Sequence, residues 1–201
     1  MTTQPTRAQL RKALRQQRRD LSSLQQRQAA RALKQRLSTH PWLRRAQHVA
    51  LYLANDGEID PAPLLQWLQR HGKQVYLPVL KRWPLTAMQF QRYGERSHWQ
   101  KNRFGIAQPR FQLRQQRRIE CLDVVLLPLV GFDAQGNRLG MGGGFYDRAL
   151  HRLQQRHHWQ GPKLIGLAHA CQQVPTLPSA SWDIPLHAIA SDQAWHYVKS
   201  H

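Results

Sequence analysis

Residues 6–37 carry apolar side chains at the three- and four-residue spacing that is typical of amphipathic helices, and we predict two helices there. Ser22 or Ser23 is suited to cap the second helix. Pro41 is expected to close the segment, because proline cannot continue a helix. The residues expected on the buried faces are Leu10, Leu14, Leu21, Ala30, Leu33 and Leu37.

After this segment the pattern changes to short runs that are apolar on both faces, as expected of strands inside a parallel sheet. Such runs occupy residues 49–54 and 75–80, and a helix is predicted between them from Asp60 and Pro61 to Gly72. This order predicts a right-handed strand, helix and strand crossover. Later elements are predicted as a strand or hairpin through Met88 and Phe90, strands over 122–130, 163–170 and 186–191, and a helix over 146–157.

Together these elements predict an α/β fold. We expect a three-layer, open and mostly parallel sheet flanked by helices, Rossmann-like, with two N-terminal helices. Residues 95–118 are polar, rich in arginine and weakly periodic, so they are predicted to be mainly loop. No repeat, low-complexity linker or break in composition divides the sequence, and residues 1–201 are predicted to form a single domain.

Composition narrows the class of protein. With 201 residues, of which 41% are hydrophobic, the chain can bury one sizeable core. It has no apolar run of about 18 residues and no apolar stretch near its start, so we predict a cytoplasmic protein without membrane contact. The spacing of Cys121 and Cys171 suits neither a disulfide framework nor a zinc site, and both are predicted to be small core residues.

The net charge of +19 predicts a surface that attracts phosphates, whether of nucleotides, polyanionic metabolites or RNA. Residues 1–45 hold 12 lysines and arginines against the single acid Asp20, so they contribute +11 of this charge. One candidate function is therefore a basic RNA-binding protein without catalytic activity. The sequence lacks the usual strand pattern of RNA-recognition domains and has no paired zinc ligands.

The strongest chemical motif is GFDAQGNRLGMGGGFYDR, at residues 131–148, between a predicted strand and a predicted helix. Glycines in such a turn let an anion approach several main-chain N–H groups and the start of the helix. The motif is not a Walker loop, and it departs from the dinucleotide-binding pattern because Phe145 stands where the last glycine would be. A flexible turn is the alternative interpretation.

Neighbouring side chains favour the anion site. Arg138 can neutralise phosphate oxygens, and Phe145 or Tyr146 can stack on a planar ring. Asp147 can hold Mg²⁺ near the same helix start. Its alternative role is that of a first-turn residue that interacts with the helix dipole.

Residues 128–133 and 136–148 together resemble the signature of the 5-formyltetrahydrofolate cyclo-ligases, also called methenyltetrahydrofolate synthetases. The order of these residues is far more specific than a generic glycine-rich loop. The similarity covers nearly the whole chain, in order. Its further segments are Arg11 with Arg15, residues 53–59, residues 104–109 and residues 182–186.

The resemblance implies roles for individual residues. Contacts to ATP are implied for Arg11, Arg15, Arg138, Leu139, Gly140, Met141, Gly142, Gly143, Gly144, Phe145 and Tyr146. Contacts to the folate substrate are implied for Leu53, Glu58, Phe104, Met141, Gly142, Gly143, Gly144 and Phe145. The implied ligands of Mg²⁺ are Asp147 and Asp183.

Two positions depart from the family pattern. Arg11 stands where the family often has lysine, and a planar guanidinium meets a phosphate with a different geometry, so Lys12 is an alternative for that role. Phe104 stands where some members have tryptophan. Apart from the resemblance, Glu58 is also interpretable as a solvated residue ahead of the helix cap at Asp60.

The implied reaction is the ATP-dependent conversion of 5-formyltetrahydrofolate into 5,10-methenyltetrahydrofolate, with ATP and Mg²⁺ as cofactors. Phosphorylation would turn the formyl oxygen into a leaving group, which requires positioning and charge neutralisation rather than a nucleophilic side chain or base. Accordingly, none of the 11 histidines is assigned a role. The substrate is expected with or without a polyglutamate tail, and the chain is predicted to be a monomer.

Overall fold

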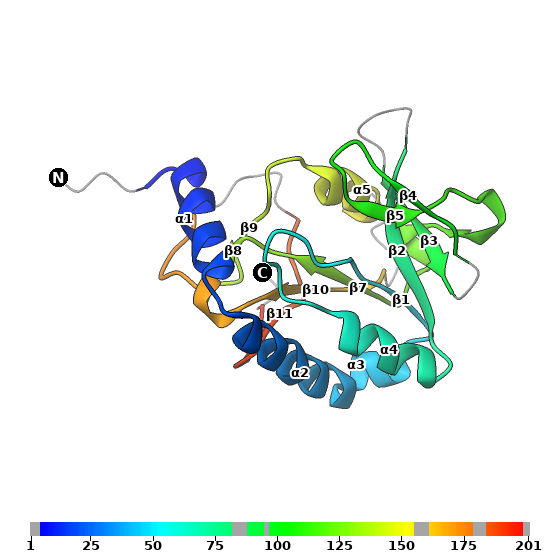
Figure 1. Ribbon diagram of the computed structural model, residues 1–201, viewed down its shortest axis with the longest axis horizontal. Coiled ribbons are helices and arrows are strands. Elements are labelled where there is room, and N and C mark those ends of the chain that lie inside the picture. The colour runs from blue at the N-terminus through cyan, green and yellow to red at the C-terminus, as the bar shows by residue number, and fades with distance from the viewer. Residues whose placement is uncertain (1–4, 82–87, 95–96, 155–160, 179–183, 199–201) are drawn as a thin grey trace.

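The computed structural model describes residues 5–81, 88–94, 97–154, 161–178 and 184–198 (Figure 1). Within them the main sheet consists of β1 (His48–Ala50), β2 (Gln74–Leu80), β3 (Met88–Tyr93), β6 (Gln116–Arg117), β7 (Val124–Pro128), β10 (Lys163–Ala168), β11 (Ala188–Ser191) and β12 (Trp195–Tyr197). Their order across the sheet is β12-β11-β10-β7-β1-β2-β3-β6. The strands from β11 to β2 pair in parallel, and β12, β3 and β6 pair antiparallel with their neighbours at the two ends of the sheet. The predicted mostly parallel α/β fold is confirmed.

The helices among the described residues are α1 (Arg7–Arg19), α2 (Ser23–Thr39), α3 (Pro41–Arg45), α4 (Ala62–Arg70) and α5 (Phe145–Gln154). Capping boxes begin the first two, where Thr6 pairs with Gln9 and Ser22 pairs with Gln25. The two predicted N-terminal helices are therefore confirmed. Pro41 does not simply close the segment, because it occupies the first position of a short third helix, where its missing N–H costs nothing.

The two faces of the sheet bury separate cores, which makes the fold three-layered. Val49 and Ala50 of β1 show the division, because neighbouring residues of a strand point to opposite faces: Val49 packs with α2, α3 and α4, and Ala50 packs with Leu150 of α5. Figure 1 shows these three helices together along one side of the sheet and α5 on the other.

Two small hairpins complete the structure around the sheet. They are formed by β4 (Trp99–Lys101) with β5 (Ala107–Pro109), and by β8 (Gly131–Phe132) with β9 (Arg138–Leu139). Short 3-10 helices span η1 (Leu113–Gln115), η2 (Ile119–Cys121) and η3 (Ala170–Gln172). The prediction of mainly loop over residues 95–118 was thus incomplete, because this segment contains the β4–β5 hairpin and the edge strand β6. Their polar side chains give no strand pattern in the sequence. No helix in the described part of the chain combines the length and apolarity needed to cross a membrane.

The two cysteines were predicted to be small core residues, and this prediction was wrong. The thiols of Cys121 and Cys171 are free, and both residues are exposed. Cys121 lies in η2 and Cys171 in η3, short 3-10 helices in which neighbouring residues are the buried ones.

The connections around β1 and β7 determine where a ligand can bind. From β1 the chain runs through α4 to β2, whereas from β7 it runs through α5 to β10, on the other side in the sheet order. Because these neighbouring parallel strands lead away in opposite directions, a crevice opens beyond their carboxyl ends.

Candidate functional site

A cavity of about 1110 Å³ lies beyond the carboxyl ends of β1, β2 and β7. This volume slightly exceeds the range of about 300–1,000 Å³ that is usual for small-molecule sites. Most of the predicted site residues line it: Arg11, Leu53, Glu58, Phe104, Arg138, Gly140, Met141, Gly142, Gly143, Gly144, Phe145, Tyr146 and Asp147. Arg15 and Leu139 do not. Asp183 lies outside the described residues.

The glycine-rich turn forms one wall of this cavity between β9 and α5. Gly142 and Gly144 have φ values of +92° and +62°, which favour glycine because a Cβ atom would be strained there. Arg11 crosses from α1 and donates from Nε to the carbonyl of Gly140 over 2.8 Å. The first-turn amides of α5 have no partners within the helix, so the wall offers main-chain donors together with an arginine.

Arg138 and Asp147 form an ion pair beside the start of α5. Nη2 of Arg138 donates to Oδ1 of Asp147 over 2.6 Å, and its Nη1 donates to the carbonyl of Ile184. The arginine is only 8% exposed, whereas the carboxylate is about one third exposed. A buried guanidinium fixed in this way presents a positive charge at a defined place, which is what a phosphate site requires.

Leu139 and Arg15 occupy different surroundings from the one predicted. The side chain of Leu139 is buried in a small core with Leu14, Val130 and Leu177. Arg15 donates from Nε to the Asp56 carboxylate over 2.7 Å. Lys12, the alternative to Arg11, is exposed and does not line the cavity.

Asp56, in the turn that follows β1, forms ion pairs with three arginines of α1. Burial alone would raise its pKa, but hydrogen bonds from Arg15, Arg19 and Arg18 lower the pKa of this carboxyl to about 2. The residue also has a φ of +54°, which is uncommon outside glycine. The hydrogen bonds from the three arginines of α1 to Asp56 therefore fix the conformation of this turn.

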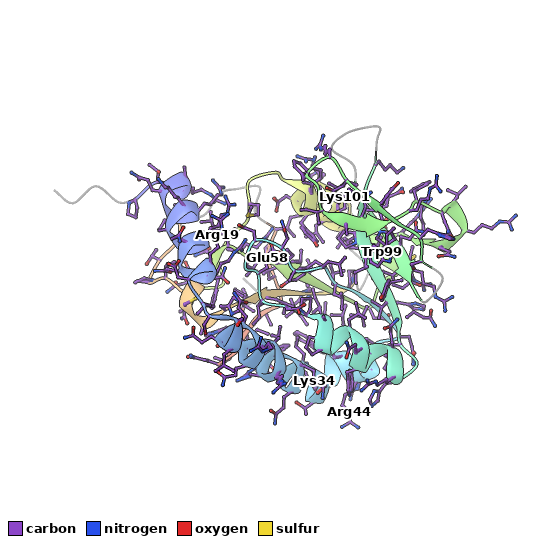
Figure 2. The ribbon with its side chains drawn as sticks, viewed as in Figure 1. Arg19, Lys34, Arg44, Glu58, Trp99 and Lys101 are labelled. Carbon is purple, nitrogen blue, oxygen red and sulfur yellow. The ribbon has the colours of Figure 1, made fainter. Side chains whose placement is uncertain are left out.

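Glu58 lies two residues farther along the same turn and lines the cavity. Its Oε2 accepts from the main-chain N–H of Asn55 over 3.1 Å, and its Oε1 lies 3.9 Å from Nη2 of Arg18. Burial raises its pKa to about 7, against the opposing charge of Arg18. In Figure 2, Glu58 lies near the middle of the molecule, between Arg19 of α1 and Lys101 of the β4–β5 hairpin.

An aromatic pair joins the β4–β5 hairpin to the start of α5. Phe104, in the loop of the β4–β5 hairpin, meets Phe145 edge to face with ring centroids 5.9 Å apart. The guanidinium of Arg103 lies over both rings, at 4.9 Å and 5.3 Å from their centroids. Phe104 is 57% exposed, which leaves an apolar surface at the mouth of the cavity.

Comparison with known proteins shows the family to which the chain belongs. The model of the 5-formyltetrahydrofolate cyclo-ligase family matches residues 3–192. The chain belongs to this family. The 5-formyltetrahydrofolate cyclo-ligase of Escherichia coli K12 is 42% identical over 185 residues, covering 92% of this chain and all of its own length. That of Haemophilus influenzae is 42% identical over 191 residues, covering 94% of this chain and 98% of its own.

Solved structures of cyclo-ligase relatives agree. The NMR structure of Aquifex aeolicus 5,10-methenyltetrahydrofolate synthetase has a TM-score of 0.82 and 27% identity, covering 97% of this chain and 94% of its own. The Mycoplasma pneumoniae enzyme of the same name has a TM-score of 0.69 and 25% identity, covering 94% and 99%. The family resemblance and the fold predicted from the sequence are confirmed.

Sequence reasoning missed Arg18 and Asp56 in this cyclo-ligase. A signal was present, because Arg15, Arg18 and Arg19 lie at the three- and four-residue spacing of one helix face. Asp56-Gly57 directly after a strand was the second signal, since this pair is common in turns with positive φ. Neither feature alone shows that the arginines and the aspartate meet.

Proposed function

We propose that the chain converts 5-formyltetrahydrofolate into 5,10-methenyltetrahydrofolate, using ATP and releasing ADP and phosphate. The observation that carries the proposal is that one cavity joins the glycine-rich turn and Arg138 to Glu58 and Phe104, in a chain of the cyclo-ligase family. The glycine-rich turn and Arg138 suit a phosphate, and Glu58 and Phe104 suit a planar ring with hydrogen-bond donors.

In the proposed reaction the formyl oxygen attacks the terminal phosphorus of ATP, and the bond from that phosphorus to ADP breaks. The nearby anilinic nitrogen then attacks the formyl carbon and loses its proton. The bond from this carbon to the phosphorylated oxygen breaks, which releases phosphate and leaves the methenyl bridge. Arg138, Arg11 and the amides of the glycine-rich turn would neutralise the phosphoryl charge and align the two ligands.

Among the basic residues of α1, the position of Arg11 supports its proposed ATP role more directly than that of Lys12, because Arg11 lines the cavity. Its Nε binds Gly140, which leaves the remaining guanidinium donors for phosphate. Arg15 uses its Nε for Asp56, so we propose that it would reach ATP with its terminal nitrogens. Leu139 would contribute main-chain atoms alone, because its side chain is buried.

The residues present fit a magnesium ion at Asp147. No group of three His, Cys, Asp or Glu side chains suited to a metal occurs among the described residues. Mg²⁺, however, is commonly held by one or two carboxylates together with substrate phosphates and water. Asp147 lines the cavity with a partly exposed carboxylate, and Asp183 is proposed as the second ligand. When bound, the ion would help neutralise the phosphates of ATP.

Glu58 and Phe104 are proposed to bind the folate ring system, Glu58 by accepting hydrogen bonds and Phe104 by covering a face. Leu53 lines the same part of the wall, next to the β1 end. Phe104→Ala is therefore expected to raise the KM for the folate about 5-fold, since an aromatic contact contributes about 1 kcal/mol. The KM for ATP and the melting temperature should change little, because the ring is mostly exposed.

Phe111→Ala is the matched control for this variant. Phe111 is also exposed and follows β5, but it does not line the cavity. Initial rates at varied folate concentration compare the two. Equal effects of both substitutions would contradict the role of Phe104.

The direct test of the proposed function is the absorbance of the methenyl product formed by the purified chain from 5-formyltetrahydrofolate. Product that requires both ATP and Mg²⁺ is the expected result. The absence of ATP-dependent product, together with submicromolar RNA binding at physiological salt, would instead favour the RNA-binding interpretation of the +19 charge.

A further inference from the structure

Arg18 is a fully buried arginine in α1, behind the wall of the cavity rather than at its surface. Its Nε donates to the main-chain carbonyl of Asp56 over 2.8 Å, and its Nη2 donates to the carboxylate of the same residue over 2.9 Å. A guanidinium is costly to bury unless its donors find partners. The buried guanidinium of Arg18 therefore finds its partners in the turn that carries Glu58.

The other contacts of Arg18 reach further segments of the wall. Nη2 lies 3.9 Å from Oε1 of Glu58 and 4.0 Å from the sulfur of Met141 in the glycine-rich turn. Nη1 lies 3.4 Å from the carbonyl of Leu129, just after β7. Glu58, Met141 and Leu129 all line the cavity. A single planar side chain thus contacts the turn after β1, the residue just after β7 and the glycine-rich turn.

The turn also packs against the main chain of Arg18. Asp56 and Gly57 adopt consecutive positive φ values of +54° and +74°, and a Cβ atom on Gly57 would lie 3.1 Å from the carbonyl oxygen of Arg18. Gln26 donates to that same carbonyl over 2.9 Å. The backbone that presents Glu58 is therefore packed directly on the end of α1.

We propose that Arg18 is a positioning residue for the folate site: its guanidinium fixes the Asp56 turn from behind and holds the Glu58 carboxylate at the cavity wall. This inference rests on the proposed function, in which Glu58 binds the folate ring. Arg18 acts through Glu58 and does not touch the substrate.

The charges around Glu58 agree with such a role. Burial raises the pKa of Glu58 to about 7, and the charge of Arg18 is the leading influence that lowers it. Asp56 raises this pKa and Arg15 lowers it to a smaller degree. Burial, and after it the charge of Glu58, raises the pKa of the phenols of Tyr52 and Tyr146. Without Arg18, the carboxylate would ionise only at higher pH and would lose its fixed orientation.

The test compares Arg18→Met with Arg19→Met in the full chain. Arg19 also pairs with Asp56, from the exposed side of α1, so its replacement removes the same charge from the same partner. Arg18→Met is expected to raise the dissociation constant of 5-formyltetrahydrofolate about 30-fold, the scale of one lost contact to a charged group. It should also move the acidic limb of kcat/KM for the folate to higher pH. Arg19→Met should leave both quantities close to those of the parent.

A double-mutant cycle with Glu58→Gln shows whether Arg18 acts through Glu58. In the Glu58→Gln background, Arg18→Met is expected to weaken folate binding by less than about 3-fold, because the partner that it positions is already gone. An undiminished effect in that background would overturn the inference. So would Arg18→Met with unchanged folate affinity and an unchanged pH profile, even if its melting temperature were lower.

Arg18→Lys keeps the test decisive if Arg18→Met does not fold. A lysine retains the charge but cannot hold Asp56 and Glu58 with one planar fork, so folate affinity should fall by about 10-fold. Unchanged affinity in this variant would equally overturn the inference. Failure of the proposed function has a different signature, because the parent chain itself would then form no ATP-dependent methenyl product. Failure of the folate role of Glu58 is also distinct, because Glu58→Gln alone would then bind the folate normally.

Discussion

Replacement of Arg138 by methionine is expected to lower kcat/KM for ATP about 1000-fold, the scale on which arginines contribute to phosphoryl transfer. Arg138 lines the cavity beside the first turn of α5, and its guanidinium is held by Asp147 and by the carbonyl of Ile184. Methionine fills a similar volume but offers no donor to a phosphate. Initial rates of methenyl formation at varied ATP concentration measure the effect.

Two further variants separate lost phosphate binding from lost structure. Arg138→Lys retains the charge without the fork and should recover part of the activity. Arg70→Met removes an exposed arginine at the end of α4, remote from the cavity, and should leave the kinetics unchanged. Because Arg138 also pairs with Asp147, melting temperatures belong in the comparison. A folded Arg138→Met protein with parental kinetics for ATP would show that the proposed ATP role of Arg138 is wrong.

The interior strands could be predicted from the sequence because each of them is buried on both faces. A strand with helices on both sides buries both faces, so its residues cannot alternate between apolar and polar. Val124–Pro128 of β7 shows this, with consecutive residues packed into opposite cores. The edge strand β6 has two residues and polar side chains, and no periodic pattern marks it.

The glycine-rich turn could also be predicted, since its chemistry is local. Consecutive glycines between a strand and a helix predict a turn with accessible main-chain N–H groups, which favours an anion site over a flexible turn once Arg138 is considered with them. Glu58 and Phe104 differ, because only their positions in the family motif pointed to them. They come from separate loops, and only the tertiary structure brings both to the cavity that the glycine-rich turn also lines.

The cluster of Arg18 and Asp56 marks the limit of such prediction. A helix with arginines on one face is usually solvated there, and periodicity describes that face as exposed. Arg18 is instead completely buried, because the turn after β1 covers it and supplies its partners. An ion pair between distant segments forms only when the fold brings them together. No local pattern in the sequence therefore predicts that Arg18 and Asp56 meet.

Glu58→Gln is expected to lower kcat/KM for the folate about 100-fold at pH 8, because neutral glutamine replaces the charged acceptor of hydrogen bonds to the pterin ring. The parent chain should show an acidic limb with a midpoint near pH 7, since burial raises the pKa of Glu58 to about 7. Below that pH the carboxyl is protonated and loses acceptor strength, so kcat/KM should fall tenfold per pH unit. The Glu58→Gln variant should lack this limb.

Asp60→Asn is the matched control for Glu58→Gln. Asp60 lies two residues farther along the same segment, and its side chain accepts from the N–H of Ala62 at the start of α4. Asparagine keeps a side-chain oxygen that can accept from this N–H, so both stability and the acidic limb should persist. If Asp60→Asn abolished the limb and Glu58→Gln kept it, the titrating group would not be Glu58. If both variants kept it, the limb would belong to another group, and the turn after β1 would position the folate without a change of charge in this pH range.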